Sequence, residues 1–246
     1  MEKNVVEQNP EHVSFISKGE EFFEKYKKWI IIVAAAIVVI VLGFFGFKKF
    51  IQEPKQKEAN DKSYRAEQLF ARAQTRPVEA NANSINAEQA FTNEDYQRAL
   101  DGDEANDIMG LNEIIAQYGN TPAGNRAKYQ AAICNLRLGN LDEAMNLFDK
   151  YKGKDLLTPI LNEMLKGDVE AEQQNNEAAL KHYMKAVKMD NNSITAPYAL
   201  FKAGLVNLIL NDKEKALECF KTIKDDYPES PLYNEVDGYI SYTENL

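Results

Sequence analysis

The sequence GNLDEAMNLF (Gly139–Phe148) returns in altered form at two later places, as NNEAALKHY (Asn175–Tyr183) and as NDKEKALECF (Asn211–Phe220). In each copy an alanine is followed four residues later by an aromatic residue. The alanines lie 35 and 37 residues apart, at Ala144, Ala179 and Ala216. Self-similarity at such a period is typical of a solenoid in which each copy is one pair of helices. We therefore predict an all-α array of stacked helical hairpins.

Small and aromatic residues recur at matching positions of the copies. Where the two helices of a hairpin approach closely we expect only small side chains, namely Ala132, Gly167 and Gly204 in the first helices and Ala144, Ala179 and Ala216 in the second. The aromatic residues one turn on, Phe148, Tyr183 and Phe220, are expected to fill the gap to the next hairpin. Gly139 follows a first helix, at a place where a residue with positive φ often ends a helix.

The three copies set the expected boundaries of the helical hairpins in the part of the chain that follows the apolar segment. We expect hairpins over residues 125–156, 160–192 and 197–228. A degenerate earlier hairpin would have its helices over 88–100 and 108–118, the first broken early by Asp101-Gly102-Asp103, and 231–242 reads as a solvating cap helix. With this period and the small-then-aromatic signature, residues 90–230 resemble tetratricopeptide repeats. We assign residues 88–246 to one repeat domain.

The segment WIIIVAAAIVVIVLGFFGF (29–47) contains no charged residue. As a helix its 19 residues would extend ~28 Å, close to the ~30 Å hydrocarbon core of a bilayer. Paired lysines flank it on both sides, at Lys27-Lys28 and Lys48-Lys49. A cleaved signal peptide fits poorly because 28 residues precede the segment, and a soluble core helix is seldom apolar on every side. We predict an uncleaved transmembrane helix.

The segments before and after the predicted transmembrane helix are interpreted from their pattern of polar and apolar residues. Residues 1–28 form a polar tail followed by an amphipathic stretch from Phe15 to Lys28, read either as a helix on the membrane surface or as a solvated extension of the span. Residues 48–87 are expected to be a helical linker, in which Pro54 ends or kinks the membrane helix. Within it, 57–74 is amphipathic, with Ala59, Ala66, Leu69, Phe70 and Ala73 available for packing, and 75–86 reads as a loop.

Charge is distributed unevenly along the chain. Both flanks of the apolar segment are basic, so the positive-inside rule does not decide the orientation. A short tail before a large domain favours a cytoplasmic N-terminus. The residues after Glu58 carry a net charge of −10, which disfavours binding to nucleic acid and to anionic lipid headgroups.

Few residues suggest chemistry. The two histidines, His12 and His182, lie far apart in sequence, and no metal-binding, phosphate-binding or nucleophile motif is present. Cys134 and Cys219 occupy apolar positions of their helices, so we read them as small buried side chains, with a disulfide as the alternative. We expect a protein that is not an enzyme and that has no cofactor, metal site or small-molecule substrate.

Binding to other proteins is the remaining expectation, through the concave wall that the first helices form in such arrays. We predict a protein-binding groove lined by Tyr129, Ile133, Leu136, Arg137, Met164, Tyr198, Phe201, Leu205 and Leu208, with Leu161, Asp168 and Glu172 on the same wall. The alternative for each residue is packing against neighbouring helices. An apolar groove of this kind suits an extended hydrophobic segment or an amphipathic helix.

The order of the segments along the chain supports a more specific resemblance. A short tail, a juxtamembrane amphipathic stretch (Phe15 to Lys28), one span and a degenerate C-terminal repeat domain resemble the YfgM-type ancillary translocon subunits. This resemblance implies a single-pass protein of the bacterial inner membrane whose repeats face the periplasm. It also implies the Sec translocon and secreted proteins as partners, with a role in handing clients to chaperones. The alternatives are a scaffold of envelope or cell-division complexes and a cytoplasm-facing adaptor.

Overall fold

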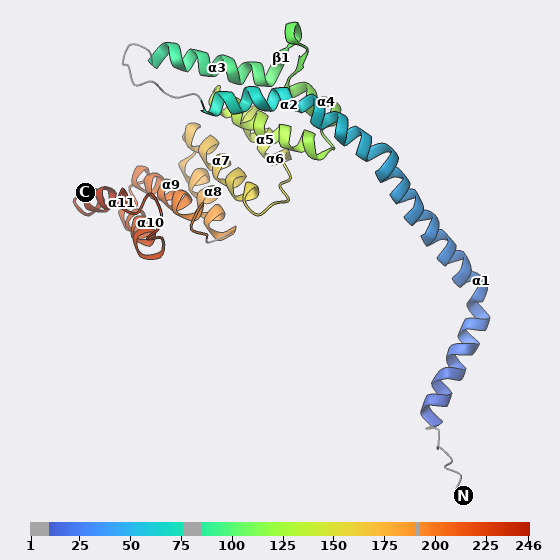
Figure 1. Ribbon diagram of the computed structural model, residues 1–246. Coiled ribbons are helices and arrows are strands. Elements are labelled where there is room, and N and C mark those ends of the chain that lie inside the picture. Colours follow the sequence, from blue (N-terminus) through green and yellow to red (C-terminus); the bar gives the residue numbers. More distant parts are fainter. Residues whose placement is uncertain (1–9, 76–84, 190–191) are drawn as a thin grey trace, which may run out of the picture. The chain divides into compact units, whose positions relative to one another are not determined.

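The computed structural model describes the backbone of residues 10–75, 85–189 and 192–246, and the side chains of 25–75, 93–189 and 192–246 (Figure 1). The chain is all-α, as predicted, and divides into two compact units, Met1–Pro54 and Lys55–Leu246. Most of the expected polar tail and of the loop at 75–86 lies outside the described residues. The same holds for the side chains of the amphipathic stretch up to Glu24.

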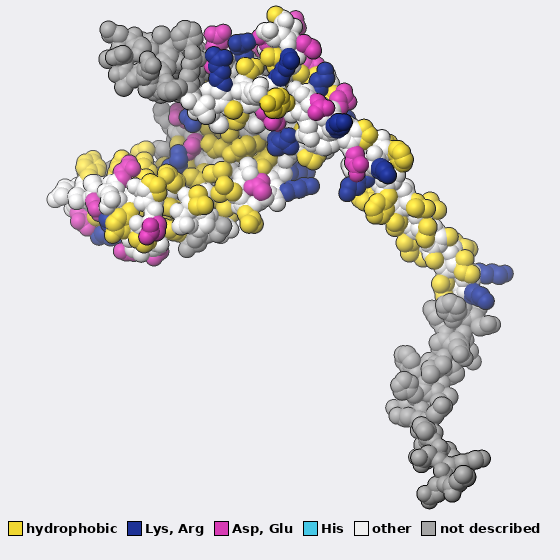
Figure 2. Space-filling model, viewed as in Figure 1, with side chains coloured by type: hydrophobic (Ala, Val, Ile, Leu, Met, Phe, Trp, Pro, Cys, Tyr) yellow, Lys and Arg dark blue, Asp and Glu magenta, His cyan; other side chains and the backbone are white. Residues whose placement is uncertain are grey.

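The first unit consists mainly of helix α1 (Pro10–Phe47), which contains the whole apolar segment. Its side chains are exposed along the segment, and Figure 2 shows an apolar surface with basic residues at both ends. The helical stretch Lys25–Thr75 includes a part that is long and apolar enough to cross a membrane. Of the two effects expected of Pro54, ending the helix does not occur, because the helical stretch continues to Thr75. A π-helical turn, η1 (Lys48–Gln52), precedes Pro54, which lies in the first turn of α2 (Glu53–Thr75), where its missing N–H is tolerated.

Helix α2 contributes to the core of the second unit. Ala59, Ala66, Phe70 and Ala73 are buried there, and Leu69 packs partly buried against the same core. This core continues through the first repeat hairpin as far as Val169. The segment that we expected to be a linker, 48–87, therefore includes a helix packed within the repeat-bearing unit.

The degenerate hairpin has an insertion between its helices. Helix α3 (Ile85–Asp101) ends at the expected break and is followed by a short antiparallel ribbon of β1 (Gly102–Asp103) and β2 (Ile108–Met109), with the 3₁₀ turn η2 (Glu104–Asn106) between them. Gly102 has φ of +86°, and a Cβ there would lie 2.3 Å from the carbonyl oxygen of Ile108. Helix α4 (Leu111–Tyr118) then completes the pair.

Three regular hairpins and a final helix follow. Their helices are α5 (Pro122–Arg137), α6 (Leu141–Lys150), α7 (Thr158–Glu172), α8 (Asn176–Met189), α9 (Ala196–Ile209), α10 (Lys213–Asp226) and α11 (Val236–Glu244). From α5 to α11 each helix contacts the next along the chain, so the hairpins stack in sequence order (Figure 1). The hairpins overlap the predicted ranges, whereas the last helix begins at Val236, later than the predicted start at residue 231.

The three hairpin turns have the same geometry. Gly139, Gln174 and Asn211 adopt positive φ of 79°, 63° and 60°. In each turn the next backbone N–H donates to a carbonyl oxygen five residues back, from Asn140 to Asn135, Asn175 to Glu170 and Asp212 to Asn207, at 2.8, 2.8 and 2.9 Å. This is the Schellman end of a helix, which satisfies otherwise unpaired carbonyl groups. The prediction of positive φ at Gly139 is confirmed.

A side-chain contact that accompanies these turns is missing from the third one. The amide of Asn140 donates to Asn135 Oδ1 at 3.2 Å, and the amide of Asn175 donates to Glu170 Oε2 at 2.9 Å. The corresponding residue in the third turn is Asp212, and an ionised carboxylate has no proton to donate. As a result Asn207, which is only 2% exposed, keeps a buried Oδ1 without a hydrogen-bond partner.

The repeated aromatic residues lie deeper than predicted. A Cβ added to Gly167 would meet Tyr183 Cε1 at 2.5 Å, and one added to Gly204 would meet Phe220 Cε1 at 2.4 Å. Each ring therefore fills the hollow that a glycine leaves on the first helix of its own hairpin. Phe220 also contacts the following element, with its ring centroid 5.4 Å from that of Tyr239 on α11. We had expected only this second kind of contact.

Candidate protein-binding groove

The predicted groove residues all lie on the first helices of the hairpins, but their exposure differs. Arg137 and Tyr198 are exposed, whereas Tyr129, Leu136, Phe201, Leu205 and Leu208 are half-buried. The two remaining residues, Ile133 and Met164, are each 7% exposed and lie in the core. A first helix contacts its own partner helix and the preceding hairpin, so two of its faces are covered. For this reason Ile133 and Met164 cannot line the wall as predicted.

The half-buried aromatic residues belong to ring clusters. Tyr129 lies 6.1 Å from Phe148 and 5.0 Å from Tyr151 between ring centroids. Burial raises the pKa of Tyr129 to about 12. Phe201 lies 4.9 Å from Tyr239 in an edge-to-face contact. These ring contacts stabilise the stack, so only part of each side chain is accessible to a partner.

A hollow of about 560 Å³ opens on the wall formed by α5, α7 and α9. It is lined by Leu136, Arg137, Gly139, Leu141, Asp168, Ala171, Glu172, Tyr183 and Lys202. Four of these residues, Leu136, Arg137, Asp168 and Glu172, were predicted for the wall. The hollow carries more charge than the apolar groove that we expected, because Arg137, Asp168, Glu172 and Lys202 converge on it.

Asp168 organises one side of this hollow. Its Oδ1 accepts hydrogen bonds from Tyr183 Oη and from Lys202 Nζ, both at 2.8 Å. Burial, followed by the charge of Asp168 and its hydrogen bond, raises the pKa of Tyr183, so the phenol stays protonated. The Lys202 ammonium also lies 5.8 Å from the centre of the Tyr183 ring. Three side chains from α7, α8 and α9 are thus held in one arrangement.

Sequence reasoning missed Lys202, although a signal for it was present. Asp168 and Lys202 are 34 residues apart, which is three fewer than the 37 residues between Gly167 and Gly204 of the same helices, so Lys202 lies about one helical turn before the position equivalent to Asp168. Opposite charges at this offset on successive first helices are the sequence signal for an ion pair across neighbouring hairpins.

Arg137 borders the same hollow from α5. Its guanidinium lies near the hydroxyl of Tyr96 on α3. Burial raises the pKa of Tyr96, and the positive charge of Arg137 partly opposes this rise. Arg137 is exposed, and its guanidinium has N–H groups that could donate to a partner.

The residues considered for chemistry are engaged in structural contacts. Cys134 and Cys219 are buried free thiols whose pKa values burial raises to about 12 and about 11. His182 Nδ1 lies 2.7 Å from Oε1 of the buried Glu163, which also pairs with Lys185 at 3.0 Å. Among the described residues, no group of three His, Cys, Asp or Glu side chains has the arrangement of a metal site.

Comparison with protein families identifies the hairpins. A family model described as tetratricopeptide repeat matches residues 126–155 and 198–230, and a second model of the same description matches 164–193. These ranges include most of the hairpins α5–α6, α9–α10 and α7–α8, which the sequence predicted. A search of curated proteins gave no match. The chain therefore carries tetratricopeptide repeats, which are typical of protein–protein interaction modules.

Proposed function

We propose that the chain is a membrane-anchored module that binds other proteins through the hollow on its repeat wall. The observation that carries this proposal is the stack of tetratricopeptide repeats whose first helices leave a hollow of about 560 Å³ uncovered, with fixed charges around it. Stacked repeats of this kind provide an extended surface for a polypeptide partner.

The anchor is helix α1. Val39, Ile40 and Leu42 keep 70%, 69% and 65% of their surface exposed, and burial of each such side chain is favourable by ~1.5–3 kcal/mol. A bilayer is the environment that removes a whole apolar helix surface from water at once. The lysine pairs Lys27-Lys28 and Lys48-Lys49 would then lie at the two interfaces.

The lining of the hollow indicates the chemistry of the partner. Arg137 and Lys202 offer donors to carboxylate or carbonyl oxygens, and Glu172 offers an acceptor to a basic side chain. Leu136 and Leu141 supply apolar contact beside them. An extended polypeptide segment with charges of both signs and a small apolar side chain fits this lining.

The resemblance to the YfgM-type subunits supports a narrower proposal. The repeats would face the periplasm of the bacterial inner membrane, beside the Sec translocon, and would assist the hand-off of secreted proteins to chaperones. The membrane helix would contact the translocon while the hollow binds an emerging client.

A stable scaffold for envelope or cell-division complexes is the second candidate, and the preformed Asp168–Lys202 pair favours it. Promiscuous binding surfaces are usually flexible and rich in methionine. This hollow instead has charges held by hydrogen bonds, which suits a partner of defined sequence.

Cross-linking from the hollow tests protein binding. A photo-cross-linker at Leu141, which lines the hollow, should capture partners from cells, and Arg137→Glu should reduce capture about tenfold, equivalent to ~1.4 kcal/mol. Lys181→Glu makes the same charge change at an exposed site on α8 and should leave capture unchanged. Many unrelated precursors in the products would indicate client hand-off, whereas a few stoichiometric proteins would indicate a scaffold. Equal capture by both variants would refute binding in the hollow.

Protease treatment of spheroplasts tests the topology. Externally added protease should digest the repeat unit if it is periplasmic and should leave it intact if it faces the cytoplasm. The second result would replace the hand-off proposal with a cytoplasm-facing adaptor.

A further inference from the structure

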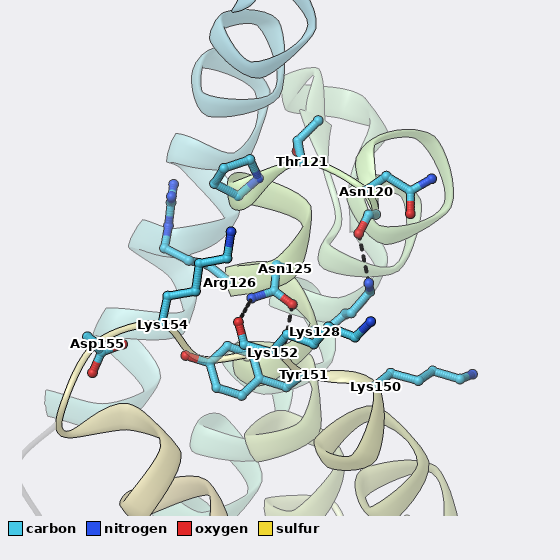
Figure 3. Close-up of a pocket in the computed structure, with 12 residues that line it drawn as sticks. Asn120, Thr121, Asn125, Arg126, Lys128, Lys150, Tyr151, Lys152, Lys154 and Asp155 are labelled. Atoms are coloured by element: carbon cyan, nitrogen blue, oxygen red, sulfur yellow. Dashed lines mark hydrogen bonds between the residues drawn. The ribbon is translucent and has the colours of Figure 1, made fainter. Parts of the chain in front are cut away.

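A second hollow, of about 630 Å³, lies at the first regular hairpin and is strongly basic (Figure 3). Its lining includes five cationic side chains, Arg126, Lys128, Lys150, Lys152 and Lys154, and one carboxylate, Asp155. We call it the basic cleft. It contrasts with the net charge of −10 carried by the residues after Glu58. A local excess of positive charge on an acidic unit favours an anionic ligand at this place.

The lysines of the cleft are not neutralised by the protein. Lys128 Nζ donates to the carbonyl oxygen of Gly119 at 2.7 Å. Burial and the positive charges of Lys152 and Lys150 lower the pKa of Lys128, so these cations repel one another. No carboxylate in the described part of the chain forms an ion pair with Lys150, Lys152 or Lys154. An anion bound among them would relieve this repulsion.

The one carboxylate of the cleft is engaged in a different task. Asp155 Oδ1 accepts hydrogen bonds from the backbone N–H of Leu157 at 3.0 Å and from both the N–H and hydroxyl of Thr158 at 2.6 Å. These contacts hold the pKa of Asp155 below its ordinary value. Its role is to order the residues at the start of α7, and its single charge leaves the cleft positive.

The loop that carries the lysines is held in place. Asn125 Nδ2 donates to the carbonyl oxygen of Lys152 at 2.8 Å, and the N–H of Lys152 donates to Asn125 Oδ1 at 3.0 Å. Figure 3 shows this double hydrogen bond beside Tyr151, whose ring packs 5.0 Å from that of Tyr129. The basic side chains are therefore presented on an ordered backbone, which lowers the entropy lost on binding.

An apolar side chain lies next to the basic residues. Leu156, the residue after Asp155, is 90% exposed. Basic side chains beside an exposed leucine are typical of surfaces that bind lipid interfaces, because the cations meet headgroup phosphates while the leucine enters the acyl boundary. A free phosphate would make no use of this leucine, and an acidic polypeptide would use it only through an apolar side chain of its own.

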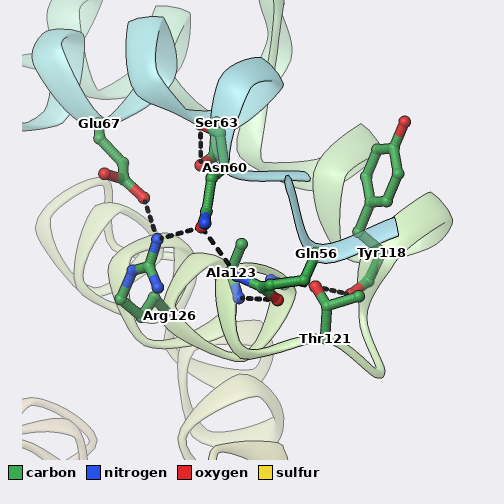
Figure 4. A network of polar contacts seen from close by, with 9 residues as sticks. Gln56, Asn60, Ser63, Glu67, Tyr118, Thr121, Ala123 and Arg126 are labelled. Carbon is green, nitrogen blue, oxygen red and sulfur yellow. Dashed lines mark hydrogen bonds and ion pairs between the residues drawn. The ribbon is translucent and has the colours of Figure 1, made fainter. Parts of the chain in front are cut away.

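The hairpin that carries the basic cleft is joined to the start of α2, the segment that follows the proposed span in the sequence. The first turn of α5 is joined to the start of α2, since Gln56 Oε1 accepts the N–H of Ala123 at 3.3 Å (Figure 4). Arg126 extends the contact, donating to Asn60 at 3.1 Å and pairing with Glu67 at 3.4 Å. Gln56 comes nine residues after Phe47, and nine residues reach at most ~30 Å even when fully extended.

We propose that the basic cleft and Leu156 bind the phosphate headgroups of anionic lipids and dock this end of the repeat unit on the bilayer that holds α1. The inference rests on the proposed membrane anchoring. Docking would orient the acidic remainder of the unit away from the anionic surface, because like charges repel.

The test uses the full chain in lipid nanodiscs. Asn120→Cys places a thiol at an exposed position on the rim of the cleft, and a fluorophore attaches there selectively because Cys134 and Cys219 are buried. Discs contain a nitroxide quencher on a lipid headgroup, in phosphatidylcholine alone or mixed with phosphatidylglycerol. We expect stronger quenching in the anionic discs and its loss at high salt.

Replacing Lys150, Lys152 and Lys154 together by Glu should weaken docking at least ~100-fold, because the loss of each lysine near an anionic surface weakens binding about fivefold. Leu156→Asn should weaken it by a smaller factor. The matched control reverses three exposed lysines on α8 and α10, Lys181, Lys188 and Lys213, and should quench like the parent.

The outcomes separate the two proposals. A chain that fails to enter discs refutes the membrane anchoring itself. A chain that enters but is quenched equally in both disc types, or whose control triple variant loses quenching to the same extent, refutes the cleft as a lipid site. A calorimetric titration of inorganic phosphate into the protein in neutral discs tests whether the cleft binds free phosphate instead. Saturable binding that the cleft triple variant abolishes would assign the cleft to free phosphate and overturn the lipid proposal.

Discussion

Gly204 on α9 is the position at which one added methyl group tests the packing of the repeats most directly. The Cβ of an alanine there would lie 2.4, 2.7 and 3.0 Å from Cε1, Cζ and Cδ1 of Phe220. The ring has no accessible surface and is held between Phe201 and Tyr239, at centroid distances of 6.0 and 5.4 Å. It therefore cannot swing aside without moving α11.

Two effects of opposite sign decide the magnitude. Replacing glycine by alanine within a helix stabilises by ~1 kcal/mol through helix propensity. Overpacking a filled core costs ~1–3 kcal/mol, and the trapped ring places Gly204→Ala in the upper part of that range. We expect a net loss of ~1–2 kcal/mol. For a unit of this size that corresponds to a fall in Tm of roughly 2–8 °C.

Thermal unfolding of the full chain in detergent, followed by circular dichroism, measures this change. Gly238→Ala on α11 is the matched control, because nothing lies within 4 Å of its added Cβ, and propensity alone should raise its Tm by a few degrees. Phe220→Leu combined with Gly204→Ala should be less destabilised than the sum of the single changes. A Gly204→Ala protein as stable as the Gly238→Ala protein would refute the proposed ring contact.

Two further changes address buried polar groups. Asp212→Asn supplies the donor that Asn207 Oδ1 lacks, whereas the exposed ion pair with Lys215 that it removes contributes little, so denaturant unfolding should show up to ~1 kcal/mol more stability. No gain would mean that the acceptor is already satisfied or that the cap which Asp212 provides to Lys215 outweighs the new hydrogen bond. Burial raises the pKa of Glu163, but hydrogen bonds from His182 and Lys185 more than offset this and leave it lowered from 4.5. Its folded pKa lies below the unfolded value, so its stabilisation is present above about pH 4.5 and is lost as the pH falls through the folded pKa. Glu163→Gln should therefore flatten the Tm profile on the acid side, and an unchanged profile would count against this pair.

The repeated pattern of small, aromatic and turn residues predicted much of the fold, because the residues that form each helix end and turn are close together in the sequence. Gly139 ends a first helix with positive φ, as expected from its place after the periodic apolar residues. Gln174 and Asn211 adopt the same conformation without glycine, because the hydrogen bonds of the helix end hold them there. The depth of the aromatic rings was not predicted, since it depends on the hollow that Gly167 and Gly204 leave on a facing helix.

The candidate groove was predicted less completely. The first helices were assigned correctly, but Ile133 and Met164 lie in the core, because a middle helix of a stack has neighbours on two sides. The basic cleft joins Arg126 and Lys128 of α5 to three lysines that follow 22 or more residues later. That convergence comes from the fold of one hairpin and from the Asn125 clamp on the loop.

The sequence by itself determined the helical hairpins, their turns and the apolar segment, because helix propensity, chain reversal and continuous hydrophobicity act over a few neighbouring residues. Tertiary structure alone decided which faces of the first helices stay open, that Asp168 meets Lys202, and that five cations share one cleft. The physical reason is that burial and the meeting of charges depend on neighbours distant in the chain, which only the stacking of the hairpins brings together.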